Sequence, residues 1–175
     1  HSPLVYSRTA LLLELSDADC CVVDLFRVRG GHEHIWSFHG PPGLFGTEGA
    51  RWIPQEGGTV AGQDIPYGGR VEEESNRALA YLDRVSRATP EGPWSGTWTG
   101  GDSRDTRLRV TGASPAGVEA IRARGGPVSG GKPYELDFLL ARSPGPHAPS
   151  PPRLPLASQF VSVIEPSSGS RVVNA

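Results

Sequence analysis

The segment CCVVDLFRVRGGHEHIWSFHG, residues Cys20–Gly40, decides the fold because it joins an apolar run, a Gly-Gly turn and a second strand-like run. Gly30 and Gly31 are typical turn residues, and His34–Phe38 follows them with the composition of a strand. The two prolines after Gly40 end that run, because proline cannot donate to a central ladder. The segment therefore predicts a β-hairpin.

The residues before this hairpin extend it into a larger antiparallel unit. Arg8–Leu15 and Cys20–Val28 are rich in Leu and Val, and the acidic SDAD between them is typical of a turn. The two runs are therefore predicted to be neighbouring strands. With His34–Phe38 they would form a three-stranded meander.

Later segments add further strands. Glu72–Ala88 fits either an amphipathic helix or a strand, and we favour the strand. Pro41–Gly69 reads as a long loop pinned by a few aromatic side chains, and the proline-rich stretch from Ser143 to Pro155 as an exposed connector. Strand patterns recur at Gly96–Thr99, Thr106–Thr111, Gly117–Ala123, Tyr134–Ala141, Gln159–Ile164 and Arg171–Val173.

These patterns predict an all-β protein. We expect an antiparallel β-sandwich of roughly nine or more strands with long Gly/Pro-rich loops, formed by residues 1–175 as a single domain. The formal net charge is −2, with 17 basic and 19 acidic residues, and the arginines are dispersed along the chain. This charge pattern argues against a nucleic-acid partner. No apolar run has the length of a membrane helix, so no membrane partner is expected.

Three histidines within the decisive segment are candidates for a site. Imidazole is a common metal ligand and acid-base group, and His32 and His34 share a face of an extended strand. His39 has the opposite parity, so it would join them only through a bulge or at the strand end. Solvated or hydrogen-bonded turn histidines are therefore the preferred interpretation, and no metal site is predicted.

Asp24 is a second candidate because it interrupts an apolar series on one face of its strand. An even-length hairpin loop would place Asp24 opposite Ser37, and an odd-length loop would place it opposite Phe38. We expect a structural role, with Asp24 bonded to the backbone or to an arginine such as Arg8. Four tryptophans could stack on sugar rings, but an aromatic in an alternating strand is more often part of a core: Trp36, Trp52, Trp94 and Trp98.

Several short motifs together carry a resemblance to a known family. They are YSRT at Tyr6–Thr9, VVDLFRVRGG at Val22–Gly31, HIWSFHG at His34–Gly40, WSGTW at Trp94–Trp98 and FVSVIEP at Phe160–Pro166. In their order and spacing they resemble the C-terminal β-sandwich region of the heparinase II/III-like family of polysaccharide lyases. Members of that family cleave uronate-containing polysaccharides by β-elimination.

The resemblance implies that this chain is the C-terminal part of a longer lyase, inactive alone, whose N-terminal α/α toroid supplies the catalytic tyrosine and histidine. No catalytic or metal residue can be carried over to this sequence, and any zinc site would lie upstream. His34 and His39 would line the cleft as substrate-binding residues. The implied partners are an acidic polysaccharide, heparin-like or alginate-like, and the toroid, in the periplasm or outside the cell. The alternative is a non-catalytic glycan-binding or structural sandwich.

Overall fold

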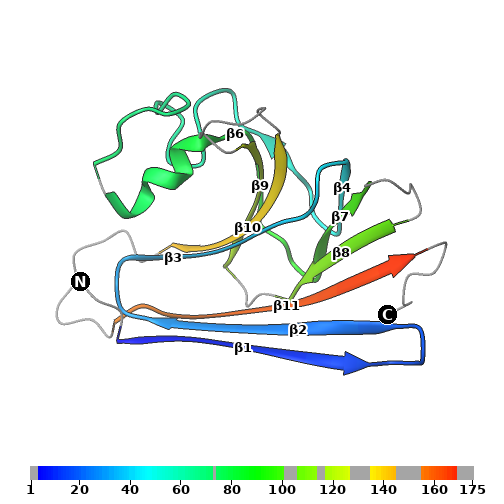
Figure 1. Cartoon of the computed structure of the whole chain (residues 1–175). Coiled ribbons are helices and arrows are strands. Elements are labelled where there is room, and N and C mark those ends of the chain that lie inside the picture. The colour runs from blue at the N-terminus through cyan, green and yellow to red at the C-terminus, as the bar shows by residue number, and fades with distance from the viewer. Residues whose placement is uncertain are drawn as a thin grey trace.

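The computed structural model describes residues 4–72, 74–100, 106–113, 117–126, 135–144 and 155–168 (Figure 1). Within them, one 3₁₀ helix, η1 (Glu74–Tyr81), accompanies eleven strands. The strands are β1 (Val5–Glu14), β2 (Cys20–Arg29), β3 (Glu33–His39), β4 (Leu44–Glu48), β5 (Ile53–Pro54), β6 (Leu82–Ala88), β7 (Trp94–Thr99), β8 (Thr106–Gly112), β9 (Glu119–Gly125), β10 (Leu136–Pro144) and β11 (Ala157–Ser168).

The strands form two antiparallel sheets. Sheet A has the order β1-β2-β11-β8-β7-β4, and sheet B has the order β3-β10-β9-β6-β5. Figure 1 shows β1, β2 and β11 as a layer beneath β3 and β10. The prediction of an all-β antiparallel sandwich is confirmed.

Two apolar clusters hold the sheets in place. The main cluster lies between the sheets and includes Trp36, Trp94, Trp98 and Phe160, each no more than 4% exposed. The preferred core role of Trp36, Trp94 and Trp98 is thus confirmed. A second cluster lies on the outer face of sheet B and includes Val60, Leu82, Val85, Ile121, Ala123 and Leu140. Both faces of sheet B are therefore buried over much of their area.

The predicted pairing of Arg8–Leu15 with Cys20–Val28 is confirmed, but the hairpin predicted within Cys20–Gly40 is wrong, and so is the three-stranded meander. β1 pairs with β2 from Val5↔Arg29 to Glu14↔Cys20. β3 instead pairs with β10 in the other sheet. Gly30 and Gly31 have φ values of 104° and 73°, and the turn that they form carries the chain from one sheet to the other. Both hairpin registers considered for Asp24 are therefore wrong.

The remaining segments combine strand and non-strand structure. The stretch expected as strand at residues 72–88 contains η1 followed by β6, so the strand prediction holds only for its second half. The predicted loop at Pro41–Gly69 contains the short strands β4 and β5. β10 extends to Pro144, into the predicted connector. The rest of that connector up to residue 154, and the strand predicted at Arg171–Val173, lie outside the described residues.

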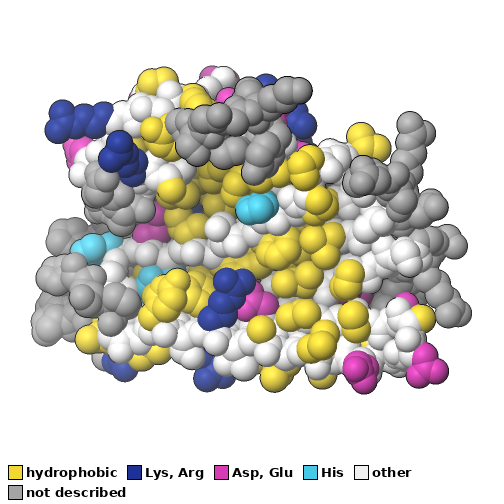
Figure 2. All heavy atoms as spheres, in the orientation of Figure 1, with side chains coloured by type: hydrophobic (Ala, Val, Ile, Leu, Met, Phe, Trp, Pro, Cys, Tyr) yellow, Lys and Arg dark blue, Asp and Glu magenta, His cyan; other side chains and the backbone are white. Residues whose placement is uncertain are grey.

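β1 is a long edge strand, and all ten of its residues are exposed. Leu11, Leu12 and Leu13 retain 46%, 66% and 43% of their accessible surface. Figure 2 shows hydrophobic side chains gathered over the lower strands of this face, where β1 and β2 run. A long apolar edge with few charges is unusual, because such edges pair readily with other strands.

Candidate functional site

His34 fastens the turn between the sheets. Its side chain is only 5% exposed, its Nδ1 lies 2.8 Å from the hydroxyl of Ser158, and its Nε2 contacts the carbonyl oxygen of Gly30. Because a carbonyl only accepts, Nε2 carries the proton and Nδ1 accepts from Ser158 when the ring is neutral. Both nitrogens of His34 are therefore engaged by the chain itself.

His39 lies at the other end of β3 in different surroundings. Its ring is exposed, with its centroid 5.1 Å from that of Phe138, and its Nδ1 is 3.3 Å from the carbonyl oxygen of Gly40. His32 is exposed in the turn before β3. No group of three or more His, Cys, Asp or Glu within the described residues could hold a metal ion. Substrate binding by His34 or His39 stays a prediction.

Asp24 forms a bond between the two sheets. Its carboxylate, 2% exposed, accepts two hydrogen bonds of 2.8 Å from Arg8 and one of 3.0 Å from Trp36 Nε1. Burial acts to raise the pKa of Asp24, but the hydrogen bonds from Arg8 and Trp36 and the charge of Arg8 outweigh it, so the pKa lies below its usual value. The predicted structural tether to Arg8 is confirmed.

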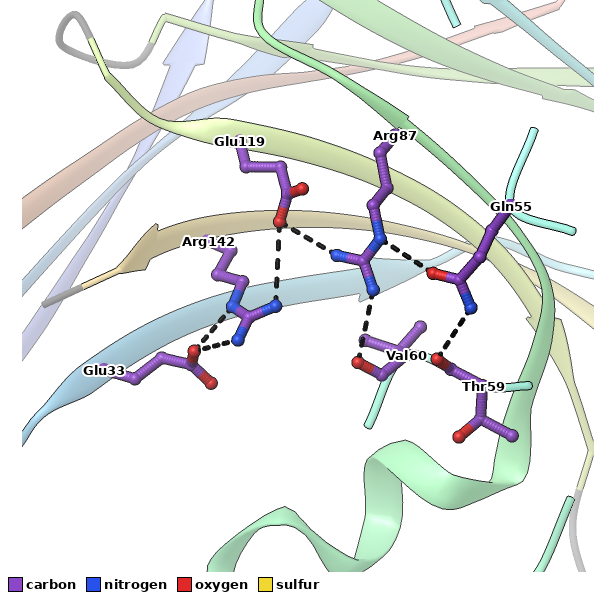
Figure 3. A network of polar contacts seen from close by, with 7 residues as sticks. All are labelled: Glu33, Gln55, Thr59, Val60, Arg87, Glu119 and Arg142. Atoms are coloured by element: carbon purple, nitrogen blue, oxygen red, sulfur yellow. Dashed lines mark hydrogen bonds and ion pairs between the residues drawn. The ribbon is translucent and has the colours of Figure 1, made fainter. Parts of the chain in front are cut away.

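A second polar network crosses the outer face of sheet B (Figure 3). Arg142 bonds Glu33 and approaches Glu119, and Arg87 donates to Glu119 and to Gln55 at 2.9 Å each. The side chains of Arg87 and Gln55 also bond backbone carbonyls of the loop after β5. Arg87 therefore holds the loop against the sheet, and Arg142 links β3 to β9 across β10.

A hollow of about 360 Å³ opens where β4 approaches the ends of β6, β9 and β10. Three arginines line it, Arg84 of β6 with Arg122 and Arg124 of β9. Asp137 of β10 and Phe45 of β4 contribute to its wall. Unlike the networks above, this arrangement places several cations around open space.

The strand pleat explains why the arginines gather there. Ile121 and Ala123 belong to the cluster on the outer face of sheet B, so Arg122 and Arg124 point to the opposite face, toward sheet A. On β10, Asp137 has the same parity as Leu139 of the inter-sheet core. The hollow is thus the polar end of the space between the sheets, on the face of β10 opposite to His39 and Phe138.

The arginines in the hollow are incompletely neutralised. Arg124 Nε lies 3.4 Å from Asp137 Oδ1 and makes no hydrogen bond, although that nitrogen is buried. Arg122 forms no ion pair within the part of the chain that the structure describes, and its guanidinium carbon lies 5.8 Å from the centroid of the Trp52 ring. The hollow therefore keeps donor capacity for an anion.

Asp137 is the unfavourable charge of this hollow. Burial raises its pKa, and the nearby charge of Arg124 opposes the rise only in part, so the pKa lies above its usual value. Arginine keeps its charge at every physiological pH. The carboxylate of Asp137 is therefore less well stabilised at this hollow than in water, even with Arg124 beside it.

The sequence did not predict this site, because arginines that alternate with apolar residues are typical of a strand with one solvent-exposed face. In IRARG, Arg122 and Arg124 alternate with apolar residues, and Arg84 is distant along the chain. The available signal was the spacing of Arg122 and Arg124 by two residues, which puts both on one face of a strand. Only the pairing of β6 with β9 brings Arg84 beside them.

A smaller hollow of about 210 Å³ on the outer face of sheet A has more acidic than basic residues in its lining. Arg107 and Arg109 line it together with the acidic residues Glu48, Glu165 and Asp19. Arg109 is already 3.6 Å from Glu48. We therefore expect an anion to bind less favourably in this hollow than in the arginine-lined one.

Comparisons with family models, with curated proteins and with solved structures gave no match to this chain. Among the described residues, no helix has the length and apolar character needed to cross a membrane.

Proposed function

We propose that this chain is the C-terminal β-sandwich part of a polysaccharide lyase acting by β-elimination on uronate-containing glycans, and that its arginine-lined hollow binds the acidic polysaccharide. The observation that carries the binding role is the gathering of Arg84, Arg122 and Arg124 around one hollow. The family resemblance supports the assignment to a lyase, and with it a periplasmic or secreted location.

The chemistry of the hollow fits a uronate ligand. A guanidinium group presents its N–H donors in a planar fork that matches a carboxylate, and uronates carry one carboxylate on each sugar ring. The half-buried ring of Phe45 lines the hollow beside the arginines and offers an apolar face for the sugar. Heparin-like glycans add sulfates, which the same donors can bind.

The same hollow supports a second function, glycan binding without any part in catalysis. What distinguishes the two functions is which other domains are encoded together with this chain. A helical toroid encoded together with this chain would favour the lyase, and a gene product without one would favour the binding module.

We expect the chain to bind alginate and heparin tetrasaccharides and to ignore neutral maltotetraose. Arg122→Gln should weaken binding about tenfold, because it removes a charge-assisted contact made by an arginine that forms no ion pair among the described residues. Isothermal titration calorimetry at two salt concentrations measures the effect, and affinity should fall as salt rises.

The matched control for Arg122→Gln is Arg27→Gln, the same change of charge on an exposed arginine of β2 in sheet A. It should leave affinity unchanged. Equal losses of affinity in the two variants would show that the effect comes from net charge alone. If the unaltered chain bound neither acidic glycan, the proposal would be overturned.

The isolated chain should show no eliminase activity on heparan or alginate. Elimination needs a base for the proton beside the carboxylate, an acid for the leaving oxygen and groups that neutralise the carboxylate. The arginines supply only the last of these, and the resemblance places the acid and base upstream. The ultraviolet absorbance of unsaturated uronates measures turnover, and sustained turnover by this chain alone would contradict the assignment of the chemistry to another part.

A further inference from the structure

One carboxylate already sits between two of the arginines at the hollow. Glu135 receives Arg84 in a forked arrangement, with Nη2 3.1 Å from Oε1 and Nη1 3.3 Å from Oε2. Arg124 Nη1 lies 3.3 Å from the same Oε2. Two arginines from neighbouring strands thus hold one carboxylate in the geometry that an external carboxylate would take.

The backbone aims Arg84 at this place through a local distortion. Between the pairs Asp83↔Arg124 and Ser86↔Arg122, β6 advances three residues while β9 advances two, so β6 carries a bulge. Arg84 lies in the bulge with a φ of 49°, in the left-handed region that non-glycine residues rarely occupy. Bulges that redirect a side chain, and strained residues, are concentrated at binding and catalytic sites.

The contact with Glu135 is weaker than the structural ion pairs of this protein. The side chains of Arg84 and Glu135 are 58% and 52% exposed, and their bonds exceed 3 Å. By contrast, Arg87 and Glu119 are 23% and 29% exposed and lie 2.9 Å apart. Exposed pairs contribute little to stability, so Glu135 can be exchanged for another carboxylate at little cost.

We propose that Arg84 and Arg124 form a carboxylate clamp at the hollow, that Glu135 occupies the clamp in the free protein, and that a uronate carboxylate replaces it in the complex. This inference rests on the proposed function and adds to it an internal competitor. Glu135 keeps the two arginines in their forked positions. A uronate carboxylate must bind the two arginines more strongly than Glu135 does in order to replace it. Neutral sugars have no group that can displace it.

Removing the competitor should tighten binding. Glu135→Gln should raise affinity for an alginate tetramer about two- to sixfold, because an exposed ion pair occupies its site only a few times more often than it leaves it empty. Glu135→Ala, which also removes the neutral acceptor, should do at least as much. In an Arg84→Gln background the same changes should give no gain, because the clamp is then broken.

The control is Glu14→Gln on β1, at the opposite edge of sheet A from β4, which alters net charge equally and should leave affinity unchanged. Calorimetry with the alginate tetramer, with melting temperatures as a check on folding, decides among the outcomes. Unchanged or weaker binding by Glu135→Gln, a gain that persists with Arg84→Gln, or an equal gain from Glu14→Gln would overturn the clamp while glycan binding stands. No binding by the unaltered chain would overturn both proposals.

Discussion

Replacing Trp98 by alanine should lower the free energy of unfolding by about 4 kcal/mol, within the range found for buried aromatic residues. Trp98 is 1% exposed, and its ring centroid lies 4.7 Å from that of Phe45 and 5.6 Å from that of Phe38. It packs so closely on Gly40 that a Cβ there would lie 2.4 Å from the indole. Alanine would therefore leave a cavity in the core between the sheets.

The loss should extend to glycan binding. Trp98 Nε1 donates a 3.0 Å hydrogen bond to the carbonyl oxygen of Asp137, so it fixes β10 where that strand borders the arginine-lined hollow. Urea unfolding measures the stability, and calorimetry with the alginate tetramer measures affinity. Trp52→Ala is the control for the stability measurement alone, because Trp52 contacts Arg122 at the hollow. Its loss of stability should be smaller, because Trp52 is only half-buried. Equal losses from the two tryptophans would show that burial does not govern the effect.

Replacing Arg8 by leucine should lower the free energy of unfolding by about 2–3 kcal/mol at neutral pH, because it leaves the carboxylate of Asp24 buried without a counter-ion. Trp36 would still donate one hydrogen bond and the Arg8 side chain is 53% exposed, so the loss should lie at or below the lower end of the range for broken buried pairs. Adding Asp24→Asn should recover most of the loss, since the double change removes both charges and retains an acceptor for Trp36.

The pH dependence of this variant should have the opposite sign to that of the unaltered pair. With Arg8 present, the pKa of Asp24 in the folded state lies below the unfolded value of 3.8, so the pair stabilises above that pH and its contribution is lost on acidification. Without Arg8, burial raises the folded pKa above the unfolded value. The destabilisation then shrinks as pH falls from neutral toward about 4.

Urea unfolding of both proteins at a series of pH values gives the difference curve and cancels the carboxylates that they share. A difference that stays constant between neutral pH and about pH 4 would mean that Asp24 remains equally ionised in both proteins, contrary to the role assigned to Arg8.

Local patterns predicted the strands, whereas pairing between distant segments escaped prediction. The β1–β2 hairpin follows from two apolar runs and an acidic turn, in which Leu15 donates to the carbonyl oxygen of Asp19. The Gly30–Gly31 turn has the same composition in a hairpin and in a crossing between sheets. What separates the two is the burial of Trp36 and its bond to Asp24 across the sandwich, which no local pattern contains.

The candidate site escaped prediction for a related reason. Asp24 was recognised because a carboxylate on an apolar face is locally anomalous. Arg122 and Arg124 are anomalous only once both faces of sheet B are known to be covered, because on a half-exposed sheet they would simply face water. The histidines were conspicuous in the sequence, yet His34 proved to be buried and engaged at a turn.

At Arg84 the left-handed backbone lowers the stability of the fold, while the side chain contributes to glycan affinity. Among the described residues, Arg84 is the only non-glycine residue with a positive φ, a conformation that costs about 1 kcal/mol or more in an L residue. Glycine would relieve that cost and remove the guanidinium in the same step. Selection for thermal stability alone would therefore favour Arg84→Gly, which removes the clamp. A more stable variant that still binds the glycan has to keep Arg84 and the β6 bulge.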